Sequence, residues 1–152
     1  MEVVTSTEEA NNRAYVFPGQ GSQSVGMGSE LFESSQVARE TFQEADDSLG
    51  FPLSRLIFEG PATDLQNTAN SQPAIMAVSL ACVKAMEEQL GPENIPAPAF
   101  VAGHSLGEFT ALAVTSVLDV GETARLVQER GRLMQKACEQ RPGSMAAVLG
   151  LD

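Results

Sequence analysis

Ser105 is the residue whose surroundings most directly suggest chemistry. It stands at the centre of a Gly-x-Ser-x-Gly run, between Gly103 and Gly107, after the apolar residues 100–102 and before an alanine-rich helical stretch. A strand, a sharp turn and a helix in this order present a serine as an exposed nucleophile. The turn is so tight that a side chain in place of either glycine should collide with the strand or the helix. Ser105 with Glu108 also spells an N-terminal capping box, which is the structural alternative.

A glycine-rich loop at residues 19–28 follows an expected strand. Gly19 and Gly21 match the first two glycines of a dinucleotide-binding Gly-x-Gly-x-x-Gly, but Ser24 stands at the third position and no Lys-Ser/Thr pair follows. Nucleotide binding is therefore disfavoured. The loop is either a flexible turn or a place where the backbone passes close to a ligand and the Gln20 amide faces the nucleophile, because open α/β sheets gather their sites at the carboxyl ends of strands.

Arg130 is a second candidate, on a helix expected at residues 121–139. At about 100° per residue, apolar or small side chains surround it on the helix surface. They are Thr123, Leu126, Val127, Leu133, Met134 and Ala137. We therefore expect Arg130 at the centre of the buried face, where a guanidinium must find an anion. Either a protein carboxylate forms a structural ion pair with it, or its planar fork binds a substrate carboxylate.

The histidine and the two cysteines are weaker candidates for a reactive site. His104, the only histidine, is next to Ser105 at a strand end, so its side chain should point away from the hydroxyl, and we expect a structural role for it. Cys82 and Cys138 lie in helical stretches among apolar neighbours, which predicts two buried thiols. Their spacing fits neither a disulfide framework nor a metal site, and no metal is expected.

The hydrophobic pattern predicts the elements that position these residues. Short apolar runs alternate with longer helical patterns, which indicates an α/β fold with a mainly parallel sheet. Strands are expected at residues 14–17, 100–102 and 145–150. Helices are expected at residues 30–49 with an interruption, 53–58, 72–90 with Pro73 in the first turn, 106–115 and 121–139.

Composition and charge limit the possible partners. The chain has 152 residues, 43% hydrophobic and 19% charged, as expected for one globular domain. Its net charge of −11 argues against nucleic acid as a partner, and no apolar run is long enough to cross a membrane. Residues 1–12 have the composition of a flexible, acidic tail without a targeting signal, so the cytoplasm is the expected compartment.

Four blocks of the sequence together resemble the malonyl-CoA:acyl carrier protein transacylases, the acyltransferases of fatty-acid synthesis that also occur as polyketide-synthase domains. The blocks are residues 17–23 (Phe-Pro-Gly-Gln-Gly-Ser-Gln), 71–74 (Ser-Gln-Pro-Ala), 103–108 (Gly-His-Ser-Leu-Gly-Glu) and 128–134 (Gln-Glu-Arg-Gly-Arg-Leu-Met). They occur in family order, and the resemblance covers the chain from about residue 14 to its end. In combination the blocks are very specific, whereas any one of them alone is not.

The resemblance implies an α/β-hydrolase-like large subdomain at residues 13–142 and the first strand of a ferredoxin-like small subdomain at residues 143–152. Family members run further and carry a catalytic histidine downstream, so both subdomains are expected to be incomplete here. The missing C-terminal half of the same enzyme would then be a partner. The isolated chain is expected to be inactive.

The resemblance also implies a reaction and the residues that perform it. Carried over by position, Ser105 is the nucleophile, and the backbone N–H groups of Gln20 and Leu106 form the oxyanion hole. Arg130 would bind the free carboxylate of the malonyl group, and Gln72 would line the pocket. The implied reaction moves a malonyl group from coenzyme A through a serine ester to the phosphopantetheine thiol of acyl carrier protein, without a cofactor. Two alternatives stay open: a serine esterase or thioesterase, and an inactive fragment that only binds a partner.

Overall fold

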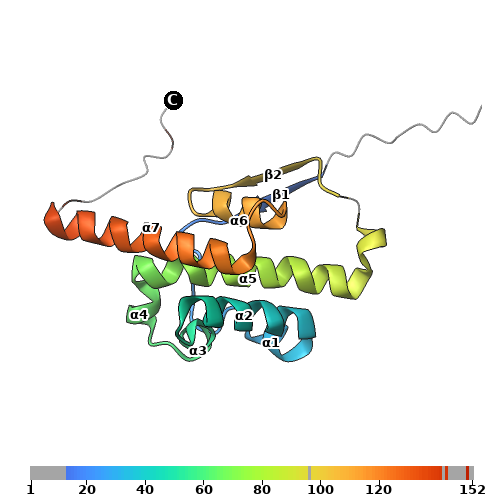
Figure 1. The fold of residues 1–152 in the computed structure, drawn as a ribbon, viewed down its shortest axis with the longest axis horizontal. Helices are drawn as coiled ribbons and strands as arrows, with labels where there is room; N and C mark the ends of the chain where they lie inside the picture. The colour runs from blue at the N-terminus through green and yellow to red at the C-terminus, as the bar shows by residue number, and fades with distance from the viewer. Residues whose placement is uncertain (1–12, 96, 142, 144–149, 151–152) are drawn as a thin grey trace, which may run out of the picture.

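The computed structural model describes residues 13–95, 97–141, 143 and 150 (Figure 1). The tail expected at residues 1–12 lies outside the described residues, and so does the strand expected at residues 145–150, apart from Gly150. The elements in chain order are β1 (Ala14–Phe17), α1 (Ser29–Ser34), α2 (Gln36–Leu49), α3 (Leu53–Glu59), α4 (Ala62–Gln66), α5 (Thr68–Leu90), the 3₁₀ helix η1 (Pro92–Asn94), β2 (Phe100–Gly103), α6 (Gly107–Val114) and α7 (Val120–Gln140).

The two strands form a parallel pair, which confirms the predicted strand direction. The register joins Ala14 to Phe100 and Phe17 to Gly103. Parallel strands require a crossover, which the helices from α1 to α5 supply. Just beyond the last pair, the His104 N–H donates to the Phe17 carbonyl at 3.0 Å. The segments that follow the two strands therefore lie side by side at one end of the sheet.

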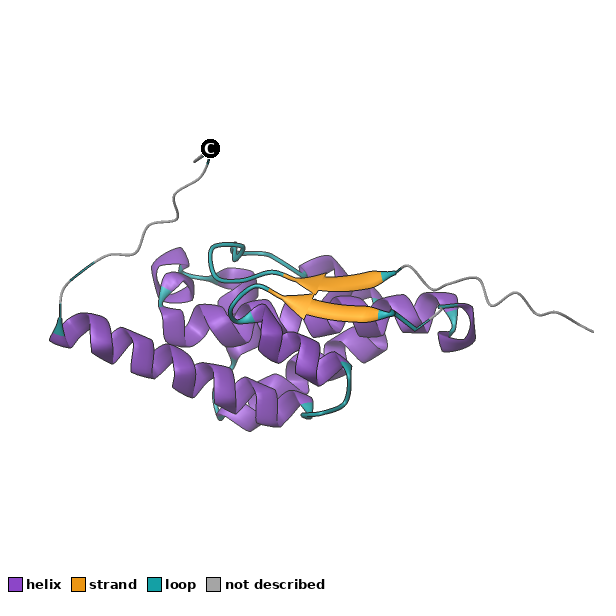
Figure 2. Cartoon of the chain, turned by 90° about the horizontal axis from the view of Figure 1, so that it is seen from above, coloured by secondary structure: helices purple, strands orange, loops and turns teal. Residues whose placement is uncertain are grey.

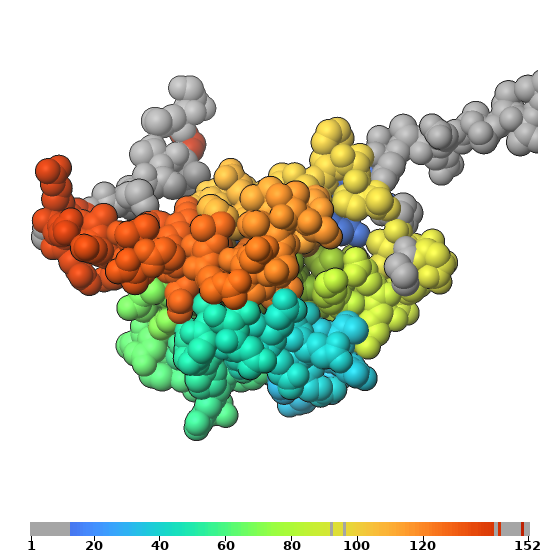
Figure 3. Space-filling view, viewed as in Figure 1, coloured from blue at the N-terminus to red at the C-terminus, as the bar shows by residue number. Residues whose placement is uncertain are grey.

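The elements lie in layers around the long helix α5. The sheet lies on α6, and α1 to α4 lie on the side of α5 away from the sheet (Figure 1). Seen from above, the two strands run side by side over the helices (Figure 2). The space-filling view shows α7 against α2 (Figure 3). On the sheet face away from α6, Val16 and Phe100 are each 73% exposed.

Two buried clusters hold the layers together. In the first, the ring of Phe42 on α2 contacts Phe32 and Phe58, and the three ring centroids lie 5.1 to 5.9 Å apart. The second cluster joins Met76 on α5 to Val127 on α7 and to Leu106, which is fully buried at the start of α6. Since Leu106 follows Ser105, the second cluster anchors the serine's turn against the helices.

The helix bounds agree with the prediction except around α4 and α5. The interruption expected within residues 30–49 falls at Ser35, whose hydroxyl caps α2 by accepting from the Ala38 N–H at 3.1 Å. Helix α4 was not predicted. Helix α5 begins at Thr68 rather than at residue 72, so Pro73 lies inside it and not in its first turn. The prediction was wrong because Asn67, which accepts from the Ala69 N–H at 3.0 Å, starts the helix upstream of the proline.

The prediction of two buried thiols is also wrong, since Cys82 and Cys138 are both exposed. Helix α5 is apolar over much of its surface, so the sequence neighbours of Cys82 do not reveal which side meets solvent. Cys138 lies near the end of α7, beyond Gly131, the last buried residue of that helix. In both helices apolar neighbours along the sequence were a poor guide to burial.

Candidate active site

Ser105 lies on a sharp turn between β2 and α6. Its φ angle is 55°, in the left-handed region that a residue with a side chain rarely adopts. A Cβ atom on Gly103 would overlap the backbone of Gly107, and one on Gly107 would lie 2.9 Å from the Pro18 carbonyl oxygen. Both glycines are therefore required, as the sequence predicted. Helix α6 has no side-chain cap, so the turn presents an exposed serine hydroxyl and does not form the capping box.

Arg130 reaches this serine from α7. Its Nη1 donates to Oε1 of Gln72 at 2.6 Å, and its Nη2 donates to Oγ of Ser105 at 2.8 Å. The guanidinium also lies over the ring of Phe109, 5.6 Å from the ring centroid. Within the described part of the chain, no carboxylate lies at salt-bridge distance from Arg130, so the structural ion pair that the sequence left open is not formed there. The cation instead faces the candidate nucleophile.

The predicted position of Arg130 on its helix is wrong, although the residue reaches the site. The buried side of α7 consists mainly of small residues, Gly121, Thr123, Ala124, Val127 and Gly131. Arg130 lies roughly 90° around the helix from the centre of that side, at its edge, and is half-buried. Leu126 and Leu133, which the sequence pattern placed beside it in the core, are 44% and 52% exposed. Small residues let α7 approach α5 closely, so they form the contact in place of the leucines.

A chain of hydrogen bonds runs from Arg130 to the loop after β1. Gln72 is fully buried, and its Nε2 donates to Oγ1 of Thr68 at 3.0 Å. The Thr68 hydroxyl donates to Oε1 of Gln20 at 3.1 Å. The structure thus joins Ser105, Arg130 and Gln72 directly, and it joins Gln20 to them through Thr68. Sequence reasoning missed Thr68, although it stands one helical turn before Gln72 on the same helix face.

Two backbone N–H groups lie in the segments that meet at the ends of the strands. One belongs to Leu106, directly after Ser105, and the other to Gln20, in the loop that packs beside the serine's turn through Gly19. Within residues 13–95 and 97–141, neither N–H donates to a protein acceptor. Free N–H groups at such a place can stabilise a negatively charged oxygen formed beside the serine.

His104 offers Ser105 no general base within hydrogen-bond reach. Its side chain is exposed and lies against Gly19, where an added Cβ would collide with Nδ1. Among the described residues no hydrogen bond joins His104 to the Ser105 hydroxyl. The contact with Gly19 instead links the loop after β1 to the turn after β2.

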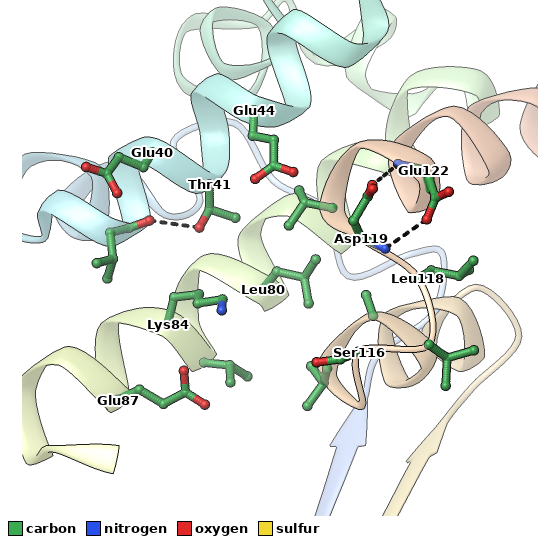
Figure 4. Close-up of a pocket in the computed structure, with 16 residues that line it drawn as sticks. Glu40, Thr41, Glu44, Leu80, Lys84, Glu87, Ser116, Leu118, Asp119 and Glu122 are labelled. Carbon is green, nitrogen blue, oxygen red and sulfur yellow. Dashed lines mark hydrogen bonds between the residues drawn. The ribbon is translucent and has the colours of Figure 1, made fainter.

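A groove of about 680 Å³ lies away from Ser105, between α2, the second half of α5 and the turn from α6 to α7. Its apolar floor includes Leu80 and Val114. Five carboxylates and one lysine line its rim (Figure 4): Glu40, Glu44, Glu87, Asp119, Glu122 and Lys84. Two of these carboxylates also form the capping box that begins α7, drawn as dashed lines in the figure. An anion would be repelled here, so the groove and the Ser105 site suit different ligands.

No three His, Cys, Asp or Glu side chains lie together as metal ligands in the part of the chain that the structure describes. None of the described helices combines the length and the apolar character that a membrane crossing requires.

The sequence is similar to two curated bacterial proteins named malonyl CoA-acyl carrier protein transacylase. The chain is 45% identical over 139 residues to the protein of Escherichia coli (strain K12), covering 91% of this chain and 44% of that relative. It is 44% identical over 139 residues to the protein of Bacillus subtilis (strain 168), covering 91% of this chain and 42% of that relative. The chain therefore spans less than half the length of these curated relatives.

The solved structures that match this chain have names related to those of the curated relatives. An acyl-carrier-protein-S-malonyltransferase from Bartonella henselae matches with a TM-score of 0.77 and 52% identity, over 82% of this chain and 40% of that one. A malonyl-transacylase solved in complex with a type II PKS acyl-carrier protein matches with a TM-score of 0.75 and 45% identity, over 82% and 39%. The profile of the acyl transferase domain family matches residues 14–150. This match includes the strand pair, the serine's turn and the Arg130 helix, and the chain belongs to the acyl transferase domain family.

Proposed function

We propose that this chain is the nucleophile-bearing part of a malonyl-CoA:acyl carrier protein transacylase. One observation carries the proposal: the Arg130 guanidinium donates to the Ser105 hydroxyl at 2.8 Å, so a nucleophile and a carboxylate-binding cation share one site. An esterase for uncharged esters would gain nothing from this cation, because a neutral substrate would leave it without an anion. The names of the E. coli and B. subtilis relatives support the same activity.

The closeness of the two groups favours a short diacid. In a malonyl thioester one methylene separates the carboxylate carbon from the thioester carbonyl carbon, a distance of about 2.5 Å. Since Nη2 of Arg130 lies next to Oγ of Ser105, a carboxylate bound to it lies just beyond the carbonyl under attack. A longer diacid would carry its carboxylate past the guanidinium. An acetyl group would leave the cation unpaired, at a cost of about 3–5 kcal/mol.

In the first half-reaction, Oγ of Ser105 attacks the thioester carbonyl carbon while a general base takes the hydroxyl proton. The carbonyl oxygen becomes an oxyanion, which we assign to the backbone N–H groups of Gln20 and Leu106. Each such donor typically lowers the barrier by about 3–4 kcal/mol. The C–S bond then breaks, the sulfur of coenzyme A receives the proton, and the malonyl group remains as an ester on Ser105. Gln72 holds Arg130 in place throughout, through the bond at 2.6 Å.

In the second half-reaction, the pantetheine thiol of an acyl carrier protein gives its proton to the general base, and its sulfur attacks the ester carbonyl carbon. The bond to Oγ of Ser105 breaks, Oγ receives the proton back from the base, and the malonyl group leaves as a thioester of the carrier protein. The solved complex of an acyl-carrier protein with its malonyl-transacylase supports this acceptor. We assign the base to the histidine that the resemblance places downstream, since His104 has no bond to Ser105. General-base help is worth about 10²–10⁴-fold, so the isolated chain should transfer malonyl groups slowly.

The proposal extends to the architecture. We assign residues 13–142 to an α/β-hydrolase-like large subdomain, because the parallel strand pair leads into a serine on a strained turn and then a helix. Residues 143–152 would begin a ferredoxin-like small subdomain. The two thiols, the acyl group and protein side chains supply every bond made or broken, so the proposed reaction needs no cofactor.

Mass spectrometry of the acyl-enzyme tests the proposal. The chain is co-expressed with the C-terminal part of the E. coli relative that it does not cover, and incubated with malonyl-CoA without an acceptor. One malonyl group should appear on Ser105, and Ser105→Ala should abolish it. Ser116→Ala is the matched control. Ser116 is also exposed and its backbone also has a left-handed conformation, with a φ of 59°, but it has no arginine partner among the described residues.

Other labelling results would contradict the assignment of Ser105 or support a different reaction. Label on Cys82 or Cys138, or label retained by Ser105→Ala, would contradict the assignment of the nucleophile. A pantetheine thiol added after labelling should discharge the ester and carry away the malonyl group. Release of malonate to water at an equal rate without the thiol would support the thioesterase instead.

A further inference from the structure

We propose that Thr68 is a positioning residue that sets the direction of the hydrogen bonds holding Arg130 at Ser105. Thr68 is the first residue of α5 and is only 8% exposed. Its hydroxyl lies between Gln20 and Gln72, at 3.1 and 3.0 Å. The inference rests on the proposed function in one respect: Arg130 must bind the substrate carboxylate for the effect on substrate choice to appear.

The direction of each bond in this chain follows from which atoms can donate and which can accept. Arg130 can only donate, so it requires the oxygen of the Gln72 amide, which it meets at 2.6 Å. The amide nitrogen of Gln72 must then find acceptors, and these are Oγ1 of Thr68 at 3.0 Å and Sδ of Met134 at 3.4 Å. The Thr68 hydroxyl is free to accept because its single proton goes to Oε1 of Gln20. All the bonds from Arg130 to Gln20 therefore point the same way, an arrangement in which each bond polarises the next.

Backbone packing holds Thr68 in this place. A Cβ atom on Gly131 would collide with the Thr68 carbonyl oxygen and would lie 2.8 Å from Cα of Ala69. Helix α7 therefore touches the first turn of α5 at the residue next to Arg130. On the other side, the Asn67 side chain caps the same turn. The backbone of Thr68 has little freedom, so its hydroxyl is held in a fixed place between Gln20 and Gln72.

Loss of the Thr68 hydroxyl should change the orientation of Arg130 through its effect on Gln72. Without Oγ1 of Thr68, the amide nitrogen of Gln72 keeps only the thioether of Met134, a weak acceptor. The amide is then no longer held with its oxygen toward Arg130, and a turned amide would place donor against donor. The guanidinium would lose the contact at 2.6 Å that orients it beside Ser105. Malonyl binding should weaken, whereas acetyl binding gains nothing from the cation and should not weaken.

Thr68→Val is the decisive variant, because valine keeps the branched shape and removes only the hydroxyl. Thr68→Ser is the matched control, since serine keeps the hydroxyl and loses a methyl group. In the 152-residue chain, the NMR signals of the Gln72 side-chain amide and the Arg130 Nε–H report the positions of these groups without turnover. We expect Thr68→Val to shift both signals and to weaken malonyl-CoA binding about tenfold, without weakening acetyl-CoA binding. Thr68→Ser should restore the wild-type values.

The outcomes separate a positioning role from a structural one. If Thr68→Val lowers the melting temperature but leaves both signals and malonyl-CoA affinity as in the wild type, the proposal is wrong. If the wild type binds malonyl-CoA and acetyl-CoA equally, the proposed function fails, and the two NMR signals alone decide the role of Thr68. If Thr68→Val does not fold, Gln20→Leu at the exposed end of the chain of bonds removes the acceptor of the hydroxyl proton. It should shift the Gln72 signal, and an unchanged signal would overturn the inference.

Discussion

Helices α5, α6 and α7 each run from the Ser105 site to the acidic groove, and the two ends differ in charge and packing. At the site end, one cation, Arg130, faces the Ser105 hydroxyl with no carboxylate partner among the described residues. At the groove end, five carboxylates and a single lysine, Lys84, line the groove (Figure 4). The site end is also tightly packed, because Gly107 and Gly131 leave no room there for a Cβ atom. The groove end is open.

This difference between the two ends suits the anionic substrate that we propose for an acidic chain. The net charge of −11 repels anions from most of the surface. From Gln72 to Glu87, α5 rises by about 22 Å. This distance is more than twice the Debye length of about 8–10 Å near physiological salt, so the Glu87 carboxylate in the groove is largely screened from the site. The charge closest to Ser105 is that of Arg130, which donates to its hydroxyl at 2.8 Å.

A carboxylate placed at the site end should have the largest effect. Gln72→Glu keeps the shape of the side chain and places a charged oxygen where Arg130 now donates at 2.6 Å. The guanidinium would form an ion pair and the new carboxylate would repel a malonyl group. We expect kcat/KM for malonyl-CoA in the co-expressed enzyme to fall on the order of 10³-fold, equivalent to about 4 kcal/mol.

The control for this variant uses the same chemical change on the same helix. Gln89→Glu also adds a carboxylate to α5, but at an exposed position near its C-terminal end. Its kcat/KM for malonyl-CoA should match that of the wild type. Wild-type kinetics in Gln72→Glu would show that the malonyl carboxylate binds elsewhere and would remove the distinction between the two ends.

Removal of the cation should have the next largest effect. Arg130→Ala should lower kcat/KM for malonyl-CoA on the order of 10²-fold and spare or improve acetyl transfer, because the cost of leaving a cation unpaired disappears. Competition between malonyl-CoA and acetyl-CoA measures the change in selectivity. Equal losses for both substrates, together with a large drop in melting temperature, would instead indicate a structural role for Arg130.

Arg132→Ala is the matched control, two residues along the same helix. The exposed Arg132 guanidinium binds Glu129 at 2.7 Å and lowers the pKa of that carboxyl. The variant should raise the pKa of Glu129 in an NMR titration and leave malonyl transfer unchanged. Because the folded-state pKa is lowered, the pair favours the folded state above the ordinary glutamate pKa and loses its effect as the pH falls through the lowered value. Both side chains are exposed, so the melting temperature should scarcely change.

Features of the site that depend on residues close together along the chain could be predicted from the sequence. The turn at Ser105 depends on two glycines within two residues of it, and the structure shows the collisions that a side chain would cause. Arg130 was found because a charged residue interrupts an apolar helical pattern. Its position was predicted wrongly because the count of apolar residues follows Leu126 and Leu133, whereas small residues form the helix contact.

The rest of the site depends on contacts between distant segments. The Thr68 hydroxyl bonds to Gln20, 48 positions upstream, and to Gln72, four positions downstream. No local sequence pattern predicts that these two residues share a partner. Pro73 pointed to a helix start at residue 72, which left Thr68 outside the expected helix. The strand direction followed from the alternation of strands and helices, but the pairing of β1 with β2 required the structure.

Replacing groove carboxylates by neutral amides should have the smallest effect on malonyl-CoA binding at the Ser105 site. Glu40→Gln with Glu87→Gln removes two of the five groove carboxylates and should change the free energy of unfolding by no more than about 0.5 kcal/mol. Malonyl-CoA affinity, measured by calorimetry at about 0.15 M salt, should stay within about twofold because the groove charges are screened. At about 0.01 M salt the Debye length is about 30 Å, so the same variant should bind malonyl-CoA more tightly than the wild type. A gain that is equal at both salt concentrations would show that the groove acts on the site through the packing of α5 and not through its charge.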